Sequence, residues 1–181
     1  MVLPTATPNK RLERTRHKRF SVKLRGRAAQ AQRSAASHTM VHPEFPVVEG
    51  RYQMTSDWAV TLPQRFNRRI EDGSLVFWRP GITAWTVVWN NDNGESQQER
   101  LEWLRTDTSP DAFDAQFFTD GDVTRYSYRL TERRDEGVVH ALHGFAIGVD
   151  GHVQMAIYFD DEADLETARA ICRSLDETDT I

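Results

Sequence analysis

The sequence predicts an α+β fold: an antiparallel β-sheet of about six strands with helices packed against it, preceded by a disordered N-terminal arm. Two observations lead to this prediction. Several short runs alternate apolar and polar side chains and are separated by turn pairs such as Asp72-Gly73 and Pro80-Gly81, which is typical of antiparallel strands. The two stretches 95–105 and 160–175 instead space their apolar residues as helices do.

The stretch from Trp58 to Trp89 holds four of the five tryptophans and is expected to form the centre of the sheet. Strands are predicted at 58–62, 74–79 and 82–89. Pro63 is expected to end the first of them, because proline has no N–H to donate to a strand ladder. The third is largely apolar on both faces, which favours a central strand with Trp85 buried in the core.

The remaining elements are assigned in chain order. Shorter strands are predicted at 50–55 and 66–70, and a strand with one charged face is predicted at 123–133. The stretch 110–118 is ambiguous between helix and strand, and we favour a short helix or loop that leads into a strand.

A hairpin around Asp150-Gly151 is the strongest local signal, because this pair is favoured in two-residue turns. Such a turn would place Val149 opposite His152 and Ile147 opposite Gln154. Small residues face large ones across the hairpin, which predicts a sheet centre covered closely by another layer.

The last predicted helix begins at Asp160 and ends near Leu175. Its first residues are acidic, which suits capping and the positive end of the helix dipole. Cys172 falls on the apolar side of this helix and is therefore expected to be a small core residue.

The charge of the chain is divided between two parts. Residues 1–39 hold ten Lys or Arg and one acidic residue, a net charge of +9, whereas the rest hold 13 basic and 26 acidic residues, a net charge of −13. Residues 1–40 have too little apolar surface to offset the entropy of ordering, so they are expected to be a disordered basic arm, with 41–181 as a single domain.

Three interpretations of this arm stay open. It suits nucleic-acid or anionic-surface binding through phosphate contacts, or a targeting segment. The run NKRLERTRHKR also resembles the translation of a repeated intergenic element, in which case translation would start at Met40. We favour this last interpretation, so a nucleic-acid partner is expected only if the arm belongs to the protein.

Several classes of protein are excluded or disfavoured. A single cysteine excludes an internal disulfide and a cysteine-rich zinc site. No stretch approaches the ~20 apolar residues of a membrane span, and the N-terminus lacks the apolar core of a secretory signal. The expected location is the cytoplasm, with no membrane partner.

No catalytic, cofactor-binding or metal-binding residue is predicted. The chain lacks the glycine-rich nucleotide motifs, the nucleophile elbow and the zinc protease motif. The acidic residues at 160–164 lack the spacing of a calcium loop, so helix capping explains them better. His140 and His143 are expected on opposite sheet faces, and His143 and His152 on one face at different levels, so polar contacts are preferred to metal binding.

The motifs WAVTLP and SLVFWRPGITAW, with the terminal hairpin and helix, make the region from Gly50 to Leu175 resemble the Mog1/PsbP-like group, which includes small bacterial DcrB-type proteins. The resemblance implies a binding, chaperone or accessory role and supplies no catalytic residues. The predicted function is therefore a non-enzymatic protein-interaction domain that binds another protein through an acidic or aromatic surface. The alternative is a small-molecule-binding domain or enzyme with a pocket beside the sheet.

Overall fold

The computed structural model describes residues 41–134 and 137–178. The described strands are β1 (Val47–Gln53), β2 (Trp58–Glu71), β3 (Ser74–Arg79), β4 (Ile82–Asn90), β5 (Phe113–Asp120), β6 (Val123–Arg134), β7 (Gly137–Ile147), β8 (Gly151–Phe159) and β9 (Asp176–Glu177). The described helices are α2 (Gln97–Thr106) and α3 (Leu165–Arg173), and a 3₁₀ turn, η1 (Glu162–Asp164), precedes α3. The arm expected at 1–40 lies outside the described residues.

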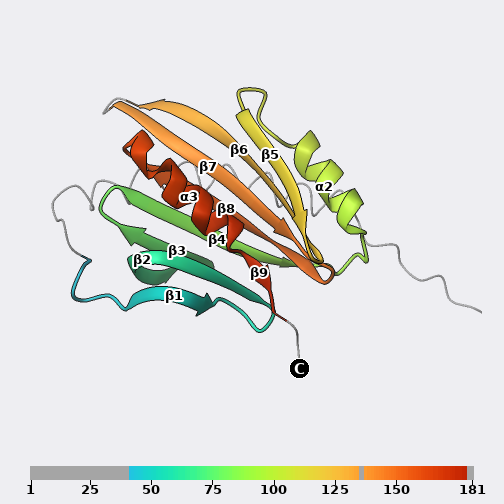
Figure 1. The fold of residues 1–181 in the computed structure, drawn as a ribbon, viewed down its shortest axis with the longest axis horizontal. Helices are drawn as coiled ribbons and strands as arrows, with labels where there is room; N and C mark the ends of the chain where they lie inside the picture. The colour runs from blue at the N-terminus through green and yellow to red at the C-terminus, as the bar shows by residue number, and fades with distance from the viewer. Residues whose placement is uncertain (1–40, 135–136, 179–181) are drawn as a thin grey trace, which may run out of the picture.

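All the described strands belong to one antiparallel sheet, shown in Figure 1. Its order is β1-β2-β3-β4-β8-β7-β6-β5, and β9 pairs with β2. The predicted α+β class is therefore wrong: the described part of the chain is mostly β, with nine strands and two short α-helices. The expected count of about six strands is too low, partly because 110–118 supplies most of β5 and the residues after α3 form β9.

Strand β2 passes through Pro63, where the sequence predicts an end. The β1–β2 pairing is irregular at this point, because Gly50 pairs with Leu62 but Val48 pairs with Phe66. On the other side, β3 pairs with β2 only from Asn67 onward. Neither neighbour therefore needs the missing N–H of the proline, and the two predicted strands at 58–62 and 66–70 are one.

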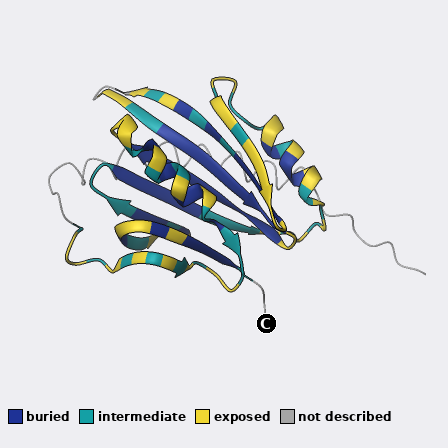
Figure 2. Ribbon diagram, viewed as in Figure 1, coloured by how far each residue is buried: buried dark blue, intermediate teal, exposed yellow. Residues whose placement is uncertain are grey.

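The sheet has a hydrophobic core on each face. The buried side chains of α3 pack on one face with residues such as Leu142 and Met155. Leu101 and Leu104 of α2 pack on the other face with Trp85 and other residues of the central strands. Figure 2 shows β4, β7 and β8 largely buried, and every residue of β8 is buried. The prediction that Trp85 is buried is confirmed, since its side chain is 0% exposed.

The hairpin between β7 and β8 is real, but its predicted register is wrong by two residues. Ile147 pairs with His152 and Phe145 with Gln154, so residues 148–151 form a wider loop. Because a shift of two leaves every side chain on its own face, the predicted faces hold: His143 and His152 lie on the α2 face, and His140 lies on the α3 face.

Two side chains that are distant in sequence form hydrogen bonds with the backbone of this loop. Arg100 of α2, 2% exposed, donates to the carbonyl oxygens of Gly148 at 2.6 Å, Val149 at 2.9 Å and Gly151 at 2.5 Å. The carboxylate of Glu177 in β9 accepts from the N–H groups of Val149 at 3.1 Å and Asp150 at 3.4 Å. The loop keeps one backbone hydrogen bond of its own, from the N–H of Gly148 to the carbonyl oxygen of Gly151 at 3.0 Å, and is bound in addition by two other elements.

Candidate functional site

The histidines weighed from the sequence lie in different surroundings. His140 stacks on Phe159 and lies 3.2 Å from a carboxylate oxygen of Glu162. His143 is buried and stacks on Tyr128 with the ring centroids 5.1 Å apart. His152, also buried, stacks against Trp89 in β4. The fold does not bring these three side chains to one point.

The acidic residues before α3 serve several structural contacts. Asp161 accepts a hydrogen bond from the N–H of Ala163 at 2.9 Å, which is a capping contact. Glu162 forms an ion pair with Arg129, and Asp164 forms one with Arg79 at 2.7 Å. Capping therefore explains only part of this cluster. Within the described ranges, no group of three or more His, Cys, Asp or Glu side chains is placed to hold a metal ion.

Cys172 lies on the buried side of α3, as the sequence predicts. It packs against Gly144 of β7, where a Cβ atom would lie only 2.5 Å from the sulfur. Burial raises the pKa of the Cys172 thiol to about 12. The thiol is therefore neutral near pH 7 and is not an activated nucleophile.

Strand β5 differs from every other part of the described sheet because apolar aromatic side chains lie exposed on it. Phe113 is 42% exposed, Phe117 is 58% exposed and Phe118 is 39% exposed. β5 pairs with β6 on one side and with no described strand on the other, and Figure 2 shows most of it exposed. The sequence leaves 110–118 ambiguous and favours a short helix or loop there, although phenylalanines favour strands, because exposure on both faces removes the alternating pattern.

The two faces of β5 are not equivalent. Phe113 and Phe118 lie close to the guanidinium groups of Arg129 and Arg125 on β6, at 4.9 Å and 5.5 Å from the ring centroids. Phe117 points to the other face, opposite Tyr126. Within the described part of the chain, Phe117 contacts neither a cation nor another ring.

The first half of β5 is irregular. Its pairing with β6 shifts between Phe113 and Gln116, and Asp114 has a left-handed φ of 52°. The carboxylate of Asp114 bonds to Arg169 of α3, which ties this bulge to the helix. The regular part of the open edge is therefore 116–120.

A small pocket lies between β5 and α3. Its lining includes Gln116 and Phe118 from β5, Arg125 and Ser127 from β6, and Arg169 and Arg173 from α3. Three arginines line it, and no described carboxylate does.

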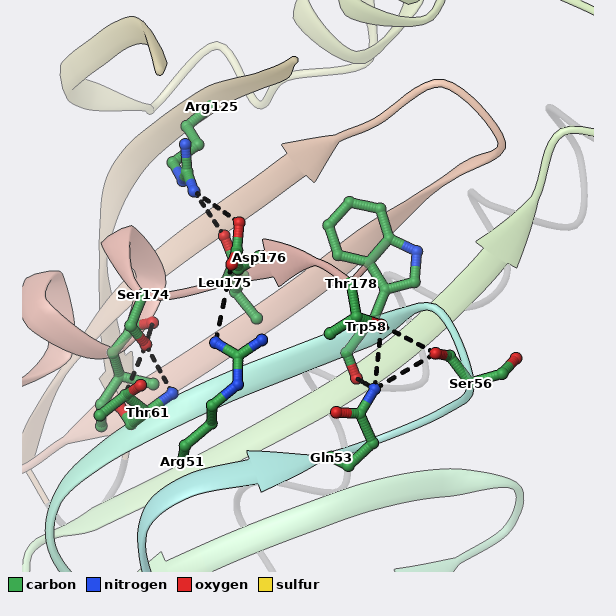
Figure 3. Close-up of polar contacts among 11 residues, drawn as sticks. Arg51, Gln53, Ser56, Trp58, Thr61, Arg125, Ser174, Leu175, Asp176 and Thr178 are labelled. Carbon is green, nitrogen blue, oxygen red and sulfur yellow. Dashed lines mark hydrogen bonds and ion pairs between the residues drawn. The ribbon is translucent and has the colours of Figure 1, made fainter. Parts of the chain in front are cut away.

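The residues after α3 bind to β1 at one edge of the sheet, as Figure 3 shows for Arg51 and Gln53. Arg125 donates to the carbonyl oxygen of Leu175 at 2.7 Å, and Asp176 lies 3.6 Å from Arg51 of β1. Gln53 bonds to Thr178 at 3.1 Å. These contacts place Arg125 between the pocket and the C-terminal segment.

Comparisons with known proteins give the fold only. No known protein family and no curated protein sequence matches the chain. Among solved structures, a protein from Bacteroides thetaiotaomicron VPI-5482, determined by crystallography at 1.50 Å resolution, is similar with a TM-score of 0.57 and 9% sequence identity. The similarity covers 72% of this chain and 49% of that one, so this chain spans about half of its length. At this identity it neither supports nor opposes a Mog1/PsbP-like relationship, which stays a prediction.

Among the described residues, no helix is both long enough and apolar enough to cross a bilayer.

Proposed function

We propose that this chain is a non-enzymatic protein-interaction domain that adds an extended segment of a partner protein to the open edge of β5. The observation that supports this most is the exposure of Phe113, Phe117 and Phe118 on one edge strand. Aromatic residues are enriched in protein interfaces, and apolar groups gathered on a surface favour burial against a partner. An edge strand also presents free N–H and C=O groups, which a partner strand can bind.

The acidic residues at the two ends of β5 favour a basic partner segment. Asp111, Asp120 and Asp122 are exposed. None of them has an ion-pair partner among the described residues. A Lys or Arg of the partner would find these carboxylates, and the free face of Phe117 suits a cation. This charge complementarity would raise the association rate and make the domain more specific for a basic partner.

Affinity capture with the full chain tests this function. We expect one partner to be retained, identified by mass spectrometry and then shown to bind again as a purified protein. Phe117→Ser should weaken that binding roughly tenfold or more, because aromatic residues at interface centres dominate binding energy.

The matched control is Ile70→Ser, which removes an exposed apolar side chain from β2; Ile70 is 67% exposed and Phe117 is 58% exposed. This variant should bind as the parent does. A partner that binds both variants equally well, or that does not bind again once purified, would contradict the proposal.

A further inference from the structure

The pocket between β5 and α3 contains a buried cation whose charge is only partly balanced. Arg125 is 7% exposed. Its guanidinium group donates to the carbonyl oxygens of Leu175 at 2.7 Å and Val123 at 3.4 Å. The carboxylate that comes within range, Asp176, is 4.0 Å away and its side chain is 49% exposed. The Nε atom of Arg125 is buried without a hydrogen-bond partner.

The surroundings of Arg125 only partly offset the cost of burying its charge. A buried charge is costly unless it is paired and its hydrogen bonds are satisfied. Two carbonyl oxygens, the ring of Phe118 at 5.5 Å and a distant, half-exposed carboxylate satisfy Arg125 only in part. An added negative charge in the pocket would lower the free energy of the folded chain.

The other lining groups favour an anion as well. Arg173 is exposed, and no described carboxylate forms an ion pair with it. Ser127 supplies a hydroxyl without a hydrogen-bond partner in the described structure. Arg169, in contrast, is already paired with Asp114 and Glu166. The neutral thiol of Cys172 adds no repulsion, since burial raises its pKa to about 12.

The size of the pocket limits what can enter. Its cavity volume of about 20 Å³ holds one water-sized group. A carboxylate or phosphate can place one oxygen inside while the rest of the molecule stays at the mouth. We propose that this pocket binds the oxyanion group of a small molecule, a carboxylate or a phosphate, through Arg125, Arg173 and Ser127. This site does not depend on the proposed binding of a partner strand.

Titration of the full chain with sodium phosphate and, separately, with sodium acetate tests the site. Ionic strength is held constant with sodium chloride, and binding is followed by calorimetry and by amide NMR shifts. One of the two anions should bind saturably with one site per chain, and shifts should centre on Ser127, Gly144 and Arg173. The anion that binds more tightly identifies the group as phosphate or carboxylate.

Two exposed or half-exposed positions provide the variants. Arg173→Gln should weaken binding about tenfold or more, the effect expected for loss of a charge-assisted hydrogen bond, and Ser127→Ala should weaken it less. Arg105→Gln, on the exposed side of α2, should bind as the parent does. The proposal is overturned if neither anion binds, if Arg173→Gln binds as tightly as the parent, or if the shifts centre elsewhere.

Discussion

Arg100 and Glu177 bind the same loop through opposite kinds of backbone group. Arg100 donates to three carbonyl oxygens of residues 148–151, and Glu177 accepts from two of the N–H groups. Burial lowers the pKa of Arg100, while the charge of Glu177 opposes that shift. The two side chains therefore add side-chain hydrogen bonds to a loop whose own backbone supplies the Gly148 N–H to Gly151 carbonyl bond at 3.0 Å.

Replacing Arg100 by Gln should destabilise the protein by about 2–4 kcal/mol, because buried carbonyl oxygens lose charge-assisted hydrogen bonds. Denaturant unfolding measures this. Arg105→Gln is the control, since Arg105 is exposed on the same helix and should change stability by less than about 0.5 kcal/mol. Equal stability of the two variants would show that Arg100 does not hold the loop.

The contact between Gly144 and Cys172 predicts a steric coupling. Gly144→Ala should destabilise the protein by about 1–3 kcal/mol, because the new methyl group meets the sulfur. Cys172→Ala removes that sulfur, so the double variant should be more stable than the sum of the two single effects predicts. Strictly additive free energies in this double-mutant cycle would mean that α3 lies farther from β7.

Cys172 also predicts a pH dependence of stability at alkaline pH. Its pKa rises from 9.0 to about 12 on folding, so the folded state keeps the proton that the unfolded state releases. Stability from this group is full below pH 9 and falls as the pH rises from 9 toward 12, by roughly 1.4 kcal/mol per pH unit. Unfolding free energies of the parent and of Cys172→Ala, compared at pH 8 to about 11, should converge as the pH rises. A constant difference would contradict a buried thiol.

The core position of Trp85 predicts a large effect of truncation. Trp85→Ala should cost about 3–5 kcal/mol, because a large cavity opens between the sheet and α2. Ile70→Ala removes an exposed side chain and should change little. Thermal unfolding of both variants measures the contrast, and similar midpoints would place Trp85 outside the core.

Local patterns predict part of this structure well. The alternation at 82–89 correctly predicts that Trp85 is buried. The hairpin pattern correctly predicts that His140 and His143 lie on opposite faces of the sheet. The register of that hairpin escapes prediction, since Arg100 and Glu177 fix the loop from about fifty and thirty residues away in sequence.

The candidate sites escape prediction for related reasons. β5 has exposed residues on both faces, so it lacks the alternation that reveals half-buried strands. The pocket joins Ser127 of β6 to Arg173 of α3, and no sequence spacing indicates that these residues meet. The continuation of β2 through Pro63 depends likewise on an irregular partner strand.

Site-specific photo-crosslinking in the native cells tests whether the open edge of β5 binds a partner protein. A photoreactive residue at Ala115, exposed on β5, should crosslink to one partner protein, through a segment rich in Lys or Arg. The same group at Glu49, exposed on the opposite edge strand β1, should not capture that partner. Crosslinking from Glu49 but not from Ala115, or from neither position, would show that β5 is not the strand that binds the partner.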